Sequence, residues 1–271
     1  MVTKTITIVA ATTVGHELTR KAIDRTQQQI RTQQVIVVSD QNFYPGSQFV
    51  AVESSFDKKD YNMFMLKHLI NFVQTDYVLI VQYDGMAVNK QYWDDEFFKY
   101  DYIGAPWLWR PQGLQVGNGG FSLRSRKLLE AVNSTSIEAY DDLNEDQIIC
   151  DSLRSQLETQ HDIAFAPVRL AHKFSHEREA EFRYSFGFHG VFNVPFYFTA
   201  QETHDFITDL PLRDQGTQLE IIPYCYSKGY IEQAEYAIAL GRQANPEFDK
   251  IFMDYVNSIP GRFNFLLDKY D

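Results

Sequence analysis

Carboxylates and glycines gather in one stretch near the middle of the chain. A hydrophobic run at residues 77–83 is followed directly by Asp84, then by a glycine-rich segment at 117–120 and the acidic pair Glu145 and Asp146. A carboxylate at the end of a buried strand can hold Mg²⁺ or Mn²⁺, which prefer oxygen ligands and neutralise a departing diphosphate. These residue types predict a site that binds a sugar nucleotide through a divalent metal ion.

Asp84 is the first candidate metal ligand. Its place at the tip of a buried strand favours that role, but a capping bond to the following turn would explain the same residue without any ligand. The residue two positions earlier is Gln82 rather than a second acid. The sequence leaves Asp84 open between a metal ligand and a turn-capping residue.

The acidic pair Glu145 and Asp146 falls in the first turn of a predicted helix at 145–159. Asn144 is the expected N-cap of this helix, and Gln147 completes a capping-box pattern. The helix dipole favours carboxylates at this position, which gives the pair a structural explanation. The functional interpretation is a general base that deprotonates an acceptor hydroxyl, with Asp146 as the first choice and Glu145 as the second.

The segment 117–120 contains three glycines around one asparagine. No Lys-Ser or Lys-Thr pair follows it, so it is not a phosphate-binding P-loop. Gly119 and Gly120 would allow the backbone to approach a sugar nucleotide closely, and a plain tight turn is the alternative. Arg124 and Arg126 come next and are candidates either for the diphosphate or for ordinary ion pairs.

Aromatic residues surround two further candidates. His189 lies between phenylalanines and glycines at 186–190, a setting that suits either a ligand of metal or phosphate or a structural histidine. Trp107 and Trp109 follow Pro106, and both are candidates for the acceptor site. We expect one of the two tryptophans in the core and the other as a stacking platform for an acceptor sugar.

Alternating elements in the first half predict an α/β fold with a mostly parallel sheet. The expected strands are residues 5–11, 35–38, 49–52 and 77–83, and the expected helices are residues 16–32 and 61–74. Ligands of such sheets bind beyond the carboxyl ends of the strands. Thr12, Thr13 and Asp40 follow strands and join Asp84 as candidates for nucleotide-sugar binding.

The second half has a different character. Residues 163–170 suit another strand, and residues 230–243 and 246–258 suit a pair of helices. We therefore expect a nucleotide-sugar-binding catalytic domain at 1–200. A mainly helical extension at 201–271 would pack on it.

Composition narrows the function classes. The net charge is −11, from 25 basic and 36 acidic side chains, which argues against binding nucleic acid through bulk electrostatics. Cys150 and Cys225 form no disulfide framework or metal-binding spacing, so a reducing compartment is expected. No signal peptide and no apolar run of about 18 residues is present, which predicts a cytoplasmic protein without stable membrane insertion.

Four ordered motifs resemble a known group of sequences. They are residues 101–107 (DYIGAPW), 116–125 (VGNGGFSLRS), the pair Glu145 and Asp146, and 186–190 (FGFHG). Together they resemble an uncharacterised family of glycosyltransferase-like domains, known only as a domain of unknown function, over roughly residues 55–200. That family is similar to GT-A glycosyltransferases, which have one Rossmann-like α/β domain that binds a nucleotide sugar, usually with a divalent metal.

The resemblance implies a role for several residues. Asp84 would be the surviving acid of the Asp-x-Asp metal motif, and His189 would complete the metal shell as Mn²⁺ or Mg²⁺ binds. Asp146 or Glu145 would supply the base of an inverting reaction. Gln82 departs from the motif, and this leaves weak metal binding, or a metal held by His189 and the diphosphate alone, as alternatives.

The sequence therefore predicts a glycosyltransferase that moves a sugar from a nucleotide-sugar donor, most simply a UDP-sugar, to a hydroxyl of a glycan acceptor. Two other classes stay open. Gln82 suits a non-catalytic binding module on the same scaffold. A nucleotidyltransferase shares the sheet type but normally has a glycine-rich basic loop after its first strand, and residues 10–16 (AATTVGH) contain little glycine and no Lys or Arg.

Overall fold

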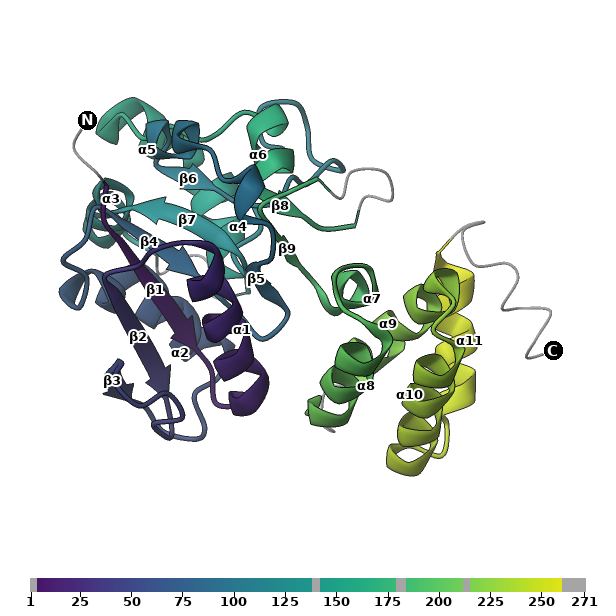
Figure 1. Cartoon of the computed structure of the whole chain (residues 1–271). Helices are drawn as coiled ribbons and strands as arrows, with labels where there is room; N and C mark the ends of the chain where they lie inside the picture. Colours follow the sequence, from purple (N-terminus) through teal and green to yellow (C-terminus); the bar gives the residue numbers. More distant parts are fainter. Residues whose placement is uncertain (1–3, 138–141, 179–183, 212–214, 260–271) are drawn as a thin grey trace. The chain divides into compact units, whose positions relative to one another are not determined.

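The computed structural model describes residues 4–137, 142–178, 184–211 and 215–259. By its internal contacts the chain divides into two compact units, residues 1–189 and 190–271. Figure 1 shows a sheet with helices around it in the first unit and helices alone in the second. The candidate residues named above all belong to the first unit.

A six-stranded sheet forms the centre of the first unit, in the order β3-β2-β1-β4-β7-β6. The first four strands in that order are parallel, whereas β7 is antiparallel to both of its neighbours. This arrangement confirms the predicted α/β fold with a mostly parallel, mixed sheet flanked by helices. The strands are β1 (Ile6–Ala11), β2 (Gln34–Ser39), β3 (Gln48–Ala51), β4 (Tyr77–Ile80), β6 (Tyr102–Ile103) and β7 (Ser122–Ser125).

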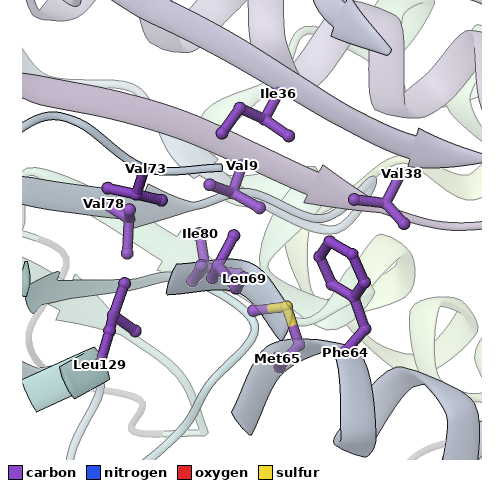
Figure 2. Packing of buried hydrophobic residues seen from close by; sticks show 10 residues of the cluster. All are labelled: Val9, Ile36, Val38, Phe64, Met65, Leu69, Val73, Val78, Ile80 and Leu129. Carbon is purple, nitrogen blue, oxygen red and sulfur yellow. The ribbon is translucent and has the colours of Figure 1, made fainter. Parts of the chain in front are cut away.

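Two helical segments follow the first strands. Helix α1 (His16–Gln29) comes after β1, and α2 (Lys58–Met63) continues through a π-helical turn, Phe64–His68, and a 3₁₀ turn, Leu69–Asn71. In Figure 2, Phe64, Met65 and Leu69 point at the valines and isoleucines of β1, β2 and β4. Burying each of these side chains contributes about 1.5–3 kcal/mol. This packing covers one face of β1, β2 and β4.

The order of the strands reverses between β1 and β4. From β1 the chain moves to β2 and β3 on one side, and β4 then returns to the other side of β1. In doubly wound sheets a crevice opens at such a switch point, beyond the carboxyl ends of the two strands. The topology therefore predicts a ligand-binding site at the residues that follow Ala11 and Ile80.

A small second sheet lies beyond β4, in the order β5-β9-β8. It is formed by β5 (Gly85–Ala87), β9 (Gly187–His189) and β8 (Ser175–His176). Strands β5 and β9 are antiparallel, and Gly85 is the register partner of His189. This pairing brings the residue after Asp84 next to the candidate histidine.

Short helices complete the first unit. After the 3₁₀ turns Lys90–Tyr92 and Asp95–Lys99 come α3 (Arg126–Ser134), α4 (Glu145–Gln147), a π-helical turn at Ile148–Ser152, α5 (Arg154–His161) and α6 (Val168–Phe174). The helix predicted at 145–159 is present, but it contains the π-helical turn and is interrupted at Leu153.

The strand predicted at 163–170 is wrong. Only Phe165 forms an isolated bridge, to Tyr102, and helix α6 then begins at Val168. Pro167 has no N–H to give to a strand, and it precedes the first turn of the helix. Leu170 and Phe174 are buried at helical spacing, a pattern too short to distinguish from a strand in the sequence alone.

The second unit is helical wherever it is described. After a 3₁₀ turn at Val191–Asn193 it contains α7 (Val194–Tyr197), α8 (Ala200–Asp209), α9 (Gln215–Lys228), α10 (Ile231–Ala244) and α11 (Phe248–Ser258). Helix α10 packs on α8, α9 and α11, and the helices predicted at 230–243 and 246–258 are confirmed as α10 and α11. None of the helices in the described residues is both long and apolar enough to cross a lipid bilayer.

Candidate active site

Asp84 occupies a tight turn directly beyond β4. Backbone hydrogen bonds close this turn in both directions: the N–H of Gln82 donates to the carbonyl of Gly85 at 3.1 Å, and the N–H of Gly85 donates back at 3.0 Å. The two residues between them are Tyr83 and Asp84. A closed two-residue turn holds the Asp84 carboxylate in a defined place at the carboxyl end of the sheet.

His189 lies between two carboxylates. Its Nε2 is 3.8 Å from Asp84 Oδ1, and its Nδ1 is 3.6 Å from Glu177 Oε1. The side-chain amide nitrogen of Asn118 is 3.0 Å from the same Nδ1. Burial lowers the pKa of His189, but Asp84 and Glu177 outweigh it and raise the pKa to about 9. The two carboxylates therefore favour the protonated imidazole at this position.

The chemistry of this donor set fits a divalent ion that is shared with a ligand. Asp84 Oδ1 and His189 Nε2 lie 3.8 Å apart, and a carboxylate and an imidazole at this separation would be the residues to hold such an ion. Within the described residues, no group of three or more His, Cys, Asp or Glu side chains is arranged to hold a metal ion. An ion here would take the rest of its ligands from a diphosphate and water, as Mg²⁺ commonly does beside phosphates.

The glycines at 119 and 120 allow close approach of the chain's own side chains. A Cβ on Gly120 would overlap the imidazole of His189 and lie 2.7 Å from Gln82 Oε1. A Cβ on Gly119 would overlap the Glu145 carboxylate. The sequence left open a close approach to a ligand or a plain tight turn as reasons for these glycines. The structure gives a third reason, which is that side chains of the protein itself pack against them.

The two acids of the pair have different surroundings. Glu145 is buried, and its carboxylate accepts two hydrogen bonds from Arg124, at 2.7 and 2.8 Å. Asp146 is half-buried; its Oδ2 accepts the Gly119 N–H at 2.8 Å, and its Oδ1 accepts the Gln147 N–H at 2.8 Å. Arg124 is fully buried, so it has no surface to offer a diphosphate.

The charge state of Asp146 follows from these surroundings. Burial is the largest influence, the negative charge of Glu145 is the second, and together they raise the pKa of Asp146 to about 6, against the opposing hydrogen bond from Gly119. A carboxylate with a pKa near 6 is ionised at neutral pH and is a stronger base than an ordinary aspartate.

One cavity, of about 270 Å³, brings several candidates together. Trp107 is 5% exposed and Trp109 is 63% exposed, so the first belongs to the core and the second offers an open ring. Asp146 and His189 line the same cavity as both tryptophans. The full lining consists of Trp107, Trp109, Arg110, Asn118, Asn144, Asp146, Gln147, Glu177 and His189.

A second cavity, of about 250 Å³, lies at the switch point between β1 and β4. Of the predicted nucleotide-binding residues at the strand ends, Thr12 lines it, whereas Thr13, Asp40 and Asp84 do not. Asp40 instead pairs with His16 at 2.8 Å. The lining consists of Ala11, Thr12, Thr19, Lys58, Tyr61, Val81, Gln82 and Tyr83.

Sequence reasoning missed several residues of the two cavities. The sequence predicts Tyr61 only as part of a helix, yet this residue lines the switch-point cavity and accepts a hydrogen bond from Gln82 Nε2 at 3.3 Å. Glu177 and Arg110 were not singled out at all. Asn118 carries a signal that could have been used, because a lone Asn among glycines suits its left-handed backbone, with φ of 52°.

Comparisons with known proteins give one family. A family model described as "Protein of unknown function (DUF5672)" matches residues 47–189, which is more than half of the chain. No curated protein matches the sequence.

Solved structures give only distant likenesses. A mannosyltransferase from Pyrobaculum calidifontis in complex with GDP-Man and Mn²⁺ has 11% identity and a TM-score of 0.45, over 98% of this chain and 84% of that one. Glucosyl-3-phosphoglycerate synthase from Mycobacterium tuberculosis has 11% identity and a TM-score of 0.32, and the match covers 46% of this chain and 58% of that one. The bifunctional IspDF of Campylobacter jejuni has 10% identity and a TM-score of 0.33, and the match covers 51% of this chain and 45% of that one. With TM-scores below 0.5, these structures support no assignment of activity.

Proposed function

The chain belongs to the DUF5672 family of proteins of unknown function, and from its own geometry we propose that it is an inverting glycosyltransferase. It would move a sugar from a nucleotide-sugar donor to a hydroxyl of a glycan acceptor. The observation that carries this proposal is the cavity that Asp146 shares with His189. A carboxylate base and a group that neutralises a leaving diphosphate are the two parts such a transfer needs.

The nucleotide is assigned to the switch-point cavity. Thr12 and Tyr61 line it, Thr13 directly follows Thr12, and Asp40 follows β2, the strand beside β1. This is the position where open α/β sheets bind nucleotides. A UDP-sugar is the donor we propose.

The diphosphate is assigned to the place where the two cavities approach each other. Gly120 adjoins His189 of one cavity and Gln82 of the other. A donor with its nucleoside in the switch-point cavity would pass Gly119 and Gly120 and place its sugar beside Asp146. The cation that Asp84 and His189 would hold, Mn²⁺ or Mg²⁺, supplies charge neutralisation of the leaving diphosphate. His189 must lose its extra proton to act as a ligand.

Asp146 is assigned the role of general base. It removes the proton of the acceptor hydroxyl while that oxygen bonds to the anomeric carbon and the bond from this carbon to the diphosphate breaks. The Gly119 N–H orients the carboxylate through its bond to Oδ2. Glu145, the second candidate, is less suited because Arg124 occupies both of its oxygens.

The acceptor is assigned to the outer part of the same cavity. Trp109 offers an exposed ring on which a sugar can stack, and the buried Trp107 supports it, with ring centroids 6.1 Å apart. The carboxylate of Asp146 lines the same space. An acceptor stacked on Trp109 can therefore present a hydroxyl to the base.

A ligand panel tests the donor assignment. UDP-, GDP-, TDP- and CMP-sugars are each added with Mn²⁺, Mg²⁺ or EDTA, and the melting temperature is measured; a ligand at 100 times its Kd stabilises the protein by about 2.7 kcal/mol. We expect one nucleotide, UDP, to raise the melting temperature only with metal. The absence of any shift contradicts the proposal.

A second candidate function rests on Gln82. Its side chain donates to Tyr61 and lies beside Gly120, where a second metal-binding acid would otherwise stand. A non-catalytic module would bind the donor without transfer and without slow hydrolysis. Measuring release of the nucleoside diphosphate from a bound donor separates the two functions.

A further inference from the structure

A buried arginine pairs with the residue directly before the candidate base. Arg124, on β7, is 0% exposed, and its guanidinium carbon is 5.3 Å from the centre of the Tyr102 ring. Its two terminal nitrogens donate to the two oxygens of Glu145, the residue directly before Asp146. The pair is therefore bidentate and shielded from water, so its geometry is fixed.

The same arginine also reaches the backbone that holds the base. Arg124 Nη2 is 3.3 Å from the Gly119 carbonyl, and Arg124 Nε donates to Ser122 Oγ at 3.0 Å. Ser122 Oγ in turn donates to the Gly119 carbonyl at 2.9 Å. Two donors thus fix the carbonyl of Gly119, and the N–H of Gly119 donates to Asp146.

Gly119 is the point where the three groups meet. A Cβ at this position would overlap Glu145 Oε1, lie 2.8 Å from Arg124 Nη2 and lie 3.0 Å from the Asp146 Cβ. Only a residue without a side chain allows the ion pair and the base to approach the same peptide. The glycine therefore belongs to this network.

Stability does not explain the network. Taking a carboxylate and a guanidinium out of water costs so much that replacing such a pair with apolar residues is often neutral or even stabilising. Neither Arg124 nor Glu145 lines the cavity. Their contacts lead instead to Asp146, by the chain through Glu145 and by the hydrogen bond through Gly119.

We propose that Arg124 is a positioning residue that holds the Asp146 carboxylate in the cavity through Glu145 and Gly119. This inference rests on the proposed function, because it takes Asp146 to be the base. Glu145 then serves as the partner of Arg124. Both act on the reaction through Asp146 and touch no substrate.

The test removes the pair without leaving a lone buried charge. In the double variant Arg124→Met/Glu145→Leu we expect the melting temperature and the donor Kd to stay close to those of the wild type. The kcat is expected to fall about 100-fold, because a misplaced catalytic group loses on that order of rate. A structural role alone would change the melting temperature and leave the kcat of the folded protein intact.

A control uses another Arg–Glu pair, in which the arginine is buried and the glutamate is exposed. Arg154 and Glu158 on α5 pair at 3.0 Å and line neither cavity, so Arg154→Met/Glu158→Leu should keep the wild-type kcat. If the first double variant is unfolded by circular dichroism, Arg124→Lys replaces it. Lysine keeps the charge beside Glu145 but lacks the planar fork that also reaches Ser122 and Gly119. We then expect about a 10-fold loss of kcat with unchanged donor affinity.

The outcomes separate this inference from the proposed function. If Asp146→Asn is inactive and the folded Arg124 variant keeps the wild-type kcat, the positioning role is overturned and the proposed function stands. If the wild type transfers no sugar, or Asp146→Asn is fully active, the proposed function itself fails.

Discussion

Asp84 Oδ1 and His189 Nε2 lie 3.8 Å apart although the two residues are distant in the sequence. The relationship depends on the small second sheet, in which Gly85 pairs with His189. One strand of that sheet begins directly after Asp84, and another ends at the histidine. The sheet thus brings together the two side chains that we propose as the metal ligands.

The Asp84–His189 pair leads to a prediction about metal-dependent donor binding. Asp84→Asn removes the carboxylate ligand, so the donor Kd measured with Mn²⁺ should weaken by at least about 10-fold. The Kd in EDTA should change little. Glu130→Gln is the control, since Glu130 pairs with Arg126 on the surface of α3. Equal Mn²⁺ dependence in the wild type and Asp84→Asn would contradict the metal site.

The raised pKa of Asp146 predicts the acid limb of the pH profile. A general base works only when it is ionised, and the pKa of the free protein governs kcat/KM, so kcat/KM should rise with pH and level off above about 6. Below the pKa the ionised fraction falls about tenfold for each pH unit. Steady-state rates between about pH 5 and pH 8 test this. A kcat/KM that stays constant over that range would exclude Asp146 as the base.

The raised pKa of Asp146 also predicts that Asp146→Asn changes the stability of the protein. Because its folded pKa is raised, Asp146 binds its proton more tightly in the folded state, and its contribution to stability falls as pH rises from about 4 to about 6. Asp146→Asn removes the free-energy cost of holding an ionised carboxylate at this half-buried position. We expect its free energy of unfolding to be about 1 kcal/mol higher than that of the wild type at pH 7, after allowance for solvent screening.

Denaturant unfolding of both proteins at two pH values checks this prediction. The advantage of Asp146→Asn should be present at pH 7 and should disappear near pH 4, where the wild-type carboxyl is protonated in the folded protein. A variant that is less stable at pH 7 would show that the hydrogen bonds of the carboxylate outweigh its desolvation.

Trp109 leads to a prediction about the acceptor. Its ring is 63% exposed beside the cavity, so Trp109→Ala should leave stability nearly unchanged. The KM for the acceptor should rise about 10-fold, because the stacking surface is lost, and the donor Kd should not change. Tyr184→Ala is a matched control, since Tyr184 is 72% exposed and lines neither cavity. An unchanged acceptor KM would remove Trp109 from the acceptor site.

The central sheet could be predicted because local pattern and tertiary environment agree. The β-branched runs of β1 and β2 become strands that are buried along almost their whole length, as expected for parallel strands covered on both faces. The pattern failed at 163–170, where Pro167 precedes a short helix, α6, whose few apolar positions fit a strand equally well. Short elements give too few positions for a period to be recognised.

The site could be predicted as a set of residues but not as an arrangement. Asp84, Asp146 and His189 were recognisable from residue type and setting. Their mutual distances depend on strands of three residues, which carry no periodic signal. The pairing of Glu145 with Arg124 likewise depends on tertiary structure, because β7 places the arginine under a helix that begins far along the chain.

The central claim is that Asp146 activates an acceptor hydroxyl for attack on a nucleotide sugar. The most direct measurement is the release of nucleoside diphosphate by the wild type and by Asp146→Asn, with the donor found in the ligand panel and a glycan acceptor. The account predicts acceptor-dependent release by the wild type, and release reduced by at least about 100-fold in a variant that still binds the donor. Equal rates in the two proteins would contradict it.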